Sequence, residues 1–183
     1  MRPTKAAAKL VLVLMSLCCP TAWSADTAGE RMFDRMRSLV GKWEGTFQWS
    51  DGRAGPLRAS YYLTGNGSAL VEDLIMGDAP SMTTVYHLDG ADLRMTHFCA
   101  AQNQPRLKAT EVNEADSSVA FSLIDVTNAA AHPAHVDGLA LHIVDSDDLT
   151  LTFDFRGASG KKAIETIVLK RVTPQPAGPE SGH

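Results

Sequence analysis

Apolar and polar residues alternate with a period of two along most of this chain, which is typical of β-strands with one buried face. In the segment 42–49, Trp43, Phe47 and Trp49 fall on one face and polar residues fall on the other. Segments of this kind recur at even spacing, separated by short turns rich in Gly, Asp and Asn. The predicted strands are 42–49, 57–64, 68–76, 82–88, 93–99, 106–113, 119–126, 139–144, 149–155 and 163–172.

One segment near the beginning of the chain has a helical period instead. Its apolar residues recur at spacings of three and four, and Gly41 follows as a stop signal. We predict a short helix over 30–40, placed across one mouth of the folded domain because it precedes the first strand. The apolar residues of this helix are Met32, Phe33, Met36, Leu39 and Val40.

About ten evenly spaced strands with short turns are typical of an all-β barrel or sandwich. A closed barrel leaves no exposed strand edges, so we predict an antiparallel up-and-down β-barrel with a short N-terminal helix. With about ten strands, the interior of such a barrel is wide enough for a small ligand. No internal repeat or second domain is visible, and residues 25–172 are expected to form a single domain.

The two ends of the chain differ from this pattern. Three basic residues precede an apolar run at 10–17, and Ala22-Trp23-Ser24 has the form of a cleavage site, so residues 1–24 are predicted to be a secretory signal peptide. The mature protein is then expected to be periplasmic or secreted. The apolar run is too short to span a bilayer, so no membrane span is expected. The Pro/Gly/Ser-rich tail 173–183 is expected to be disordered.

Charge and cysteine content narrow the class of partner. The chain has a formal net charge of −4, and the predicted signal peptide carries only positive charges. The mature protein is therefore more acidic still, which argues against binding to nucleic acid or to an anionic membrane. Cys18 and Cys19 lie in the predicted signal peptide, so Cys99 has no partner for an internal disulfide. A lone thiol in an oxidising compartment is either buried or used.

The most informative segment is a predicted hairpin within 82–106. Asp89-Gly90 followed by Ala91-Asp92 is a turn signal between two strands, and a loop of either two or four residues pairs Leu88 with Leu93. The face that contains this pair is the more apolar one, so we expect it to face the interior. Counting outward, that face places Tyr86 opposite Met95, Thr84 opposite His97 and Met82 opposite Cys99.

This inward face predicts a binding site. An apolar wall with a few polar groups is typical of small-molecule sites, so the expected partner is a small hydrophobic or amphipathic molecule. Tyr86 and His97 would orient it by hydrogen bonds. Polar residues on the loop that leaves the hairpin would anchor a head group near the mouth, with Arg106 making a bidentate contact. The predicted ligand-binding residues are Met82, Tyr86, Met95, His97, Cys99, Asn103, Gln104 and Arg106.

Other interpretations of the same residues remain open. His97 and Cys99 would bind zinc if a third ligand such as His135 came close, or would act as base and nucleophile. Alternatively, His97 is a wall residue hydrogen-bonded to Tyr86 or Thr84, and Cys99 is a small hydrophobe. The question of catalysis stays open, although the chain has no G-x-S-x-G, phosphate-loop, dinucleotide or H-E-x-x-H motif. A barrel filled by its own side chains, without a ligand, is a further interpretation.

Polar residues outside the inward face of the hairpin also have two interpretations each. Glu72 and Asp73 are neighbours in a predicted strand, so only one of them faces inward. An inward carboxylate would accept a proton or pair with Arg58, whereas a solvated one would do neither. In the loop after the hairpin, Asn103 alternatively caps a turn and Arg106 is alternatively solvated.

The segment 39–45, LVGKWEG, resembles the G-x-W-x-G opening of calycin-type barrels, the lipocalin-like and nitrobindin-like group. In that group the tryptophan closes one end of the barrel, and the glycines let the first strand bend. The segments YHLDG, THFCAAQNQPR and AHVDGL also resemble uncharacterised exported bacterial proteins of lipocalin-like type. The resemblance implies a calycin-like barrel in an exported protein.

Nitrobindin-like barrels bind haem through a histidine on a late strand, so the resemblance also implies haem as an alternative cofactor. His142 is the late-strand candidate here, and His135 lies in the loop before it. Phe47 replaces the third glycine of the nitrobindin opening, and no motif fixes the position of the haem histidine. We therefore expect no cofactor and keep zinc and haem as alternatives.

Overall fold

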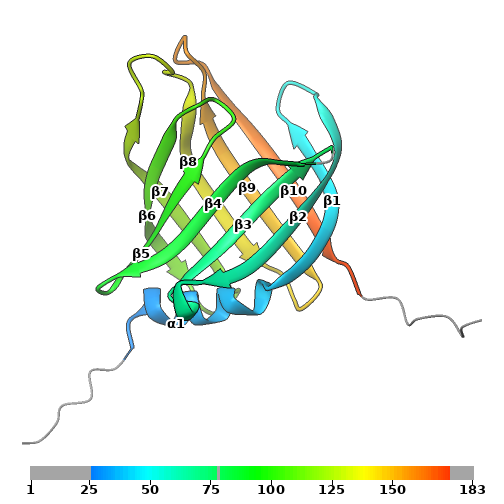
Figure 1. Ribbon diagram of the computed structural model, residues 1–183, viewed down its shortest axis with the longest axis vertical. Helices are drawn as coiled ribbons and strands as arrows, with labels where there is room; N and C mark the ends of the chain where they lie inside the picture. The colour runs from blue at the N-terminus through cyan, green and yellow to red at the C-terminus, as the bar shows by residue number, and fades with distance from the viewer. Residues whose placement is uncertain (1–25, 78, 174–183) are drawn as a thin grey trace, which may run out of the picture.

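A computed structural model describes residues 26–77 and 79–173 (Figure 1). The predicted signal peptide, and the predicted tail except for Thr173, lie outside the described residues. The elements in chain order are α1 (Ala28–Met36), the 3-10 helix η1 (Arg37–Leu39), β1 (Gly41–Trp49), β2 (Ala54–Thr64), the 3-10 turn η2 (Gly65–Gly67), β3 (Ala69–Met76), β4 (Ala79–Asp89), β5 (Asp92–Phe98), β6 (Gln104–Asn113), β7 (Ser118–Thr127), β8 (His135–Ile143), β9 (Asp148–Arg156) and β10 (Lys162–Arg171).

The described strands form one closed antiparallel barrel. Each strand pairs with its neighbours in sequence, and β1 closes the barrel by pairing with β10 (Figure 1). This confirms the predicted all-β barrel of ten strands with a short N-terminal helix. Closure gives every strand a partner on both sides, so no strand edge is left open. None of the helices in 26–77 and 79–173 is long and apolar enough to cross a membrane.

The central hairpin has the predicted register. Thr84 pairs with His97, and Tyr86 pairs with Met95 across β4 and β5. All four side chains are buried, which confirms that this face is directed into the barrel. The turn sequence succeeded as a signal because Gly90 adopts a positive φ of 59°, which a glycine reaches without steric cost.

The strand bounds differ most from prediction at β8. This strand begins at His135, whereas the alternating pattern predicts a start at Leu139. The register of β8 against β9 shifts between Val136 and Gly138, which indicates a β-bulge. A bulge inserts an extra residue and breaks the period of two. The alternating pattern therefore does not extend to the first residues of β8.

One end of the barrel is closed by α1. The helix begins with a capping box, in which Thr27 and Glu30 bond to each other's backbone N–H groups. It buries Met32, Phe33 and Met36 and contacts β4, β5 and β6, and Figure 1 shows it lying across one end of the barrel. The predicted position of the helix is therefore confirmed, and this end is not available to a ligand.

Trp43 seals the same end. Its indole Nε1 donates to the carbonyl oxygen of Leu39 at 2.8 Å, which ties η1 to the first strand. The guanidinium of Arg171 lies over the indole ring, 4.2 Å from its centroid, and also donates to the carbonyl oxygens of Val40 and Ser38. These contacts join the beginning of β1 to the end of β10 at the point where the barrel closes.

Candidate functional site

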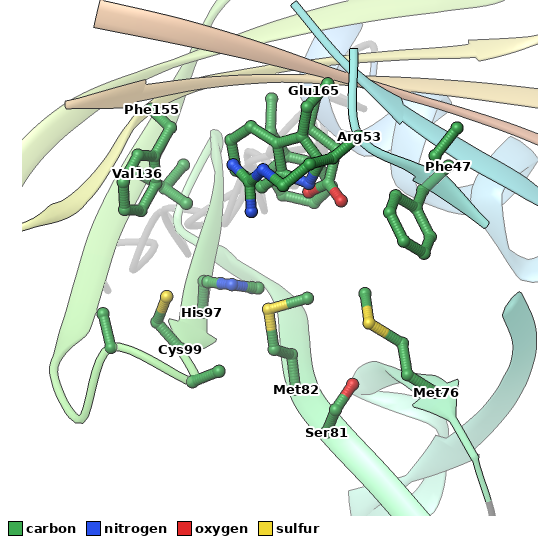
Figure 2. A pocket seen from close by; sticks show the side chains of 15 residues that line it. Phe47, Arg53, Met76, Ser81, Met82, His97, Cys99, Val136, Phe155 and Glu165 are labelled. Atoms are coloured by element: carbon green, nitrogen blue, oxygen red, sulfur yellow. The ribbon is translucent and has the colours of Figure 1, made fainter. Parts of the chain in front are cut away.

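The candidate site is a cavity of about 580 Å³ at the end of the barrel opposite α1. Figure 2 shows the side chains that line it. Its walls come from residues near the ends of β1, β3, β5 and β9, from residues near the beginnings of β2, β4, β8 and β10, and from the loop after β5. The helices α1 and η1 precede the other end of β1. Ala54, Ser81 and Ala100 line the cavity and are exposed, so it opens to solvent. The barrel is thus a cup with one closed and one open end.

Most of the cavity wall is aromatic or aliphatic. Phe47 and Trp49 extend from β1, and Phe153 and Phe155 extend from β9. The rings of Trp49 and Phe155 meet edge to face with centroids 5.6 Å apart, an arrangement that aromatic pairs favour. Two methionines add flexible apolar surface on the β3 and β4 side, as Figure 2 shows. Such a wall favours an apolar ligand.

The first polar group in this wall is Glu165, on β10 directly opposite Trp49 of β1. The residue is only 3% exposed, and its Oε1 atom has no hydrogen-bond partner among the described residues. Burial raises the pKa of this carboxyl to about 7, against the opposing effects of the Arg53 charge and the Trp49 indole. Glu165 is therefore a buried acid that faces an apolar cavity without a protein partner for Oε1.

Arg53 lies near Glu165 at the rim of the cavity (Figure 2). Its Nε atom is 2.9 Å from Oδ2 of Asp51, and its guanidinium lies over the ring of Trp49, 4.7 Å from the centroid. The positive charge of Arg53 is therefore balanced by Asp51 and held against an aromatic face. It is not held in an ion pair with Glu165.

His97 faces the cavity from β5, on the wall across from Arg53 and Glu165 (Figure 2). Its Nδ1 atom is 2.8 Å from Oγ1 of Thr84, and its ring packs against Phe153 with centroids 5.5 Å apart. The hydrogen bond to Thr84 confirms one of the interpretations of the sequence. Burial lowers the pKa of His97 to about 4, so the imidazole is neutral at neutral pH.

A buried carboxyl lies behind His97. Glu72 is fully buried, and its Oε2 atom accepts hydrogen bonds from the hydroxyls of Tyr61 at 2.8 Å and Tyr86 at 2.9 Å. The hydroxyl of Thr84 is directed at the other oxygen from 3.5 Å, which links Glu72 to His97. Burial raises the pKa of Glu72 to about 7, although these three hydroxyl groups favour the charged form.

The predicted pairing of an inward carboxylate with Arg58 is wrong. Glu72 is the inward member of its pair, as alternation requires, but its partners are hydroxyl groups. Arg58 is exposed and donates to the carbonyl oxygen of Gly77 instead. Leu57 and Ala59 are buried, so Arg58 between them lies on the outer face of β2.

Cys99 lines the cavity beside His97 and is half-buried. Burial raises the pKa of its thiol, and the nearby carboxyl of Glu165 acts in the same direction. A nucleophilic or metal-binding cysteine needs the opposite shift, because the thiolate is the reactive form. The environment of Cys99 therefore favours a neutral thiol, which behaves as a small apolar wall residue.

The predicted ligand-binding residues fall into separate groups in the structure. Met82, His97 and Cys99 line the cavity. Tyr86 and Met95 share the inward face of the hairpin but are completely buried below the cavity and do not line it. The hydroxyl of Tyr86 donates to Glu72 rather than into the cavity, so its predicted role in orienting a ligand has no support in this geometry.

The predicted head-group anchors do not line the cavity either. The buried side chain of Asn103 donates from Nδ2 to the carbonyl oxygens of His132 and Ala134, both at 2.7 Å, and so holds the loop between β7 and β8. Gln104 accepts a hydrogen bond from Thr127. Arg106 makes a bidentate ion pair with Asp125, 2.6 Å for each bond, on the exposed outer face.

The residues of the alternative metal and haem sites are also separated. The imidazole of His135 lies 3.1 Å from Oδ1 of Asp137, which also pairs with Arg156, and His135 does not line the cavity. His142 alternates with the buried residues Leu141 and Ile143, so it lies on the outer face of β8. Within 26–77 and 79–173, no group of three or more His, Cys, Asp or Glu side chains could hold a metal ion. His135 is therefore not placed to complete a zinc site with His97 and Cys99, and the late-strand candidate His142 does not face the interior.

Sequence reasoning missed Glu165, although a signal for it was present. The inward positions of β10 are Ala163, Glu165, Ile167 and Leu169, so one acidic residue interrupts an otherwise apolar face. A charged residue at an inward position of a strand is unusual unless it has a partner or a role. The aromatic wall was partly visible, since Phe47 and Trp49 were predicted to share one face of their strand.

No protein-family model matches the sequence. A search of curated proteins likewise finds no match. Among solved structures, the chain is similar to a protein of unknown function from the DUF3598 family of Nostoc punctiforme, with a TM-score of 0.50 and 16% identity over 75% of this chain and 49% of that one. The chain thus spans about half the length of that protein. At this identity the likeness supports the barrel fold alone.

Two further similarities are more distant. A redesigned β-barrel, b11L5F_LGL, matches with a TM-score of 0.34 and 14% identity over 74% of this chain and 93% of that one. The protein EF1p2_mFAP2b, solved bound to DFHBI, matches with a TM-score of 0.39 and 14% identity over 77% of this chain and 99% of that one.

Proposed function

We propose that this protein is an exported binding protein, periplasmic or secreted, that holds a small, largely apolar molecule in the cavity at the open end of its barrel. The cavity carries this proposal, because about 580 Å³ lined mainly by apolar side chains lies opposite an end closed by α1 and Trp43. This volume lies within the range of small-molecule sites, which are typically preformed and apolar. Export rests on the predicted signal peptide, and the lipocalin-like character rests on the resemblance at 39–45.

The chemistry of His97 and Cys99 supports a binding role for these two residues over a role as base and nucleophile. Burial favours the neutral forms of both the Cys99 thiol and the His97 imidazole. A base and nucleophile pair needs a thiolate or a base whose pKa is close to the working pH. His97 and Cys99 therefore contribute to the wall of a binding site in this proposal.

The first prediction concerns a substitution that fills part of the cavity. Ala101 lines the cavity from the loop after β5 and is half-buried, so Ala101→Trp should place an indole in the space that the ligand needs. Nile red, a neutral apolar dye whose fluorescence rises in apolar surroundings, should bind the parent protein. Binding by Ala101→Trp should be weaker by about tenfold or more, since the wall then excludes part of the dye.

The matched control is Ala129→Trp, which adds the same indole to an exposed loop residue outside the cavity wall. This variant should bind Nile red as the parent does. Equal loss of binding in both variants, or no loss in either, would contradict the location of the site.

A further inference from the structure

The unpartnered Oε1 atom of Glu165 points to the chemistry of the ligand, and this inference rests on the proposed function. A buried carboxylate that lacks a hydrogen-bond partner is costly, and such groups are normally paired. Glu165 is 3% exposed, its Oε1 atom has no partner in the described chain, and the residue lines the cavity. The partner for Oε1 must therefore come from the cavity itself, either from a bound molecule or from solvent water.

Arg53 favours the charged form of Glu165 but is not paired with it directly. Arg53 is the cation near the carboxyl, and it forms an ion pair with Asp51. On the facing wall, the imidazole of His97 is neutral because burial lowers its pKa to about 4, and the Cys99 thiol is neutral because burial raises its pKa. Among the described residues that line the cavity, Arg53 therefore carries the charge opposite to that of ionised Glu165, but it makes no ion pair with the carboxyl, so a cationic ligand would supply the direct partner.

The aromatic wall beside Glu165 also suits a cation. The electron-rich faces of Trp and Phe rings attract ammonium and guanidinium groups. Trp49, directly opposite Glu165 in the β1–β10 pair, already binds the guanidinium of Arg53 on its face. Phe155 packs against Trp49 and extends this aromatic surface along the cavity.

We propose that the ligand is an apolar amine, a molecule with a hydrophobic body that fills the cavity and a positively charged amino group that pairs with Glu165. An ammonium group supplies several N–H donors and a charge, so it satisfies Oε1 by a charge-assisted hydrogen bond. An alcohol of the same shape supplies one neutral donor. A carboxylate of the same shape supplies no donor and is repelled by ionised Glu165.

The test uses displacement of Nile red at pH 8, where Glu165 is mostly ionised and an alkylamine is still protonated. The competitors are decylammonium, decanol and decanoate, which share one chain length. Decylammonium should displace the dye at a concentration about tenfold lower than decanol does, and decanoate should be the weakest. In Glu165→Gln, the advantage of decylammonium over decanol should disappear, and decanol itself should compete as before.

The matched control is Glu111→Gln, which removes a carboxylate from an exposed position of β6 and should keep the parental order of competitors. The comparison in the parent protein does not depend on how either variant folds. If decanol displaces Nile red as well as decylammonium does, the amine inference is wrong and the proposed function stands. If decanoate is the strongest, Arg53 is the anchor and the inference is overturned. If Nile red does not bind the parent protein, both proposals fail.

Discussion

At the residue scale, Glu72 is the clearest case of a side chain whose contribution to the free energy of unfolding depends on pH. Its pKa is about 7 in the folded barrel and 4.5 at its ordinary value, so the folded protein holds this proton more tightly than the unfolded chain does. The contribution of protonated Glu72 to the free energy of unfolding is complete below pH 4.5 and is lost as the pH rises through 7. Above pH 7 the barrel encloses a charge that Tyr61, Tyr86 and Thr84 stabilise only in part.

Glu72→Gln removes this charge and keeps the shape of the side chain. The free energy of unfolding of the variant, relative to that of the parent, should therefore increase by about 3 kcal/mol between pH 4 and pH 8. Urea unfolding at the two pH values measures this change, and Glu111→Gln, on the exposed face of β6, should show none. A difference between Glu72→Gln and the parent that is the same at both pH values would contradict the burial of an ionisable carboxyl there.

The sequence predicted correctly which side chains face inward wherever apolar and polar residues alternate along a strand. The inward face of the hairpin was correct because the Asp89-Gly90 turn determines the register. Arg106 was predicted near the mouth from its closeness to the hairpin, but it follows buried Pro105 and precedes buried Leu107, so it faces outward. Whether Glu165 has a partner depends on side chains from other strands and from the β1–β2 turn, which a pattern along one strand does not contain.

At the element scale, the seam between β1 and β10 depends on a glycine. A Cβ atom at Gly45 would lie 1.9 Å from the carbonyl oxygen of Val168, which belongs to the backbone of β10. No side-chain rotation relieves such a contact, so the two strands would have to separate. This close approach gives a physical reason for the second glycine in the opening motif.

Gly45→Ala should therefore destabilise the barrel by about 2 kcal/mol or more, measured as a lower urea midpoint. The control is Gly157→Ala, where the added Cβ would meet its nearest neighbour, the carbonyl oxygen of Lys161, at an ordinary contact distance of 3.4 Å. That variant should unfold at close to the parental midpoint. A stable Gly45→Ala protein would show that β1 and β10 are not packed as closely as described.

The strand pattern predicted the elements well but not their irregularities. Strand β6 shifts register against β7 between Arg106 and Leu107 and again between Ala109 and Glu111. Strand β8 shifts between Val136 and Gly138, which hid its first four residues from the pattern. Bulges place two residues opposite one, so alternation alone cannot locate them. The mouth of the barrel is the region most affected, since Val136 lines the cavity.

At the scale of the whole molecule, the two ends of the barrel differ in structure. The packing of α1, Trp43 and Arg171 closes one end, and the aromatic wall around Glu165 leaves the other open. The sequence predicted the closed end, because the helix and the tryptophan motif are local signals. At the open end it predicted Met82, His97 and Cys99 but not Glu165 or Phe155, because the full lining depends on how strands far apart in sequence are staggered around the barrel.

The most direct test of the account is native mass spectrometry of the protein purified from its own producing cells, with metal analysis of the same sample. The account predicts a stoichiometric organic mass bound to the parent protein and to Ala129→Trp, with much less bound to Ala101→Trp and no stoichiometric metal. Stoichiometric zinc, iron or haem would contradict it. An organic mass held equally by Ala101→Trp and the parent would place the ligand outside the cavity and would also contradict it.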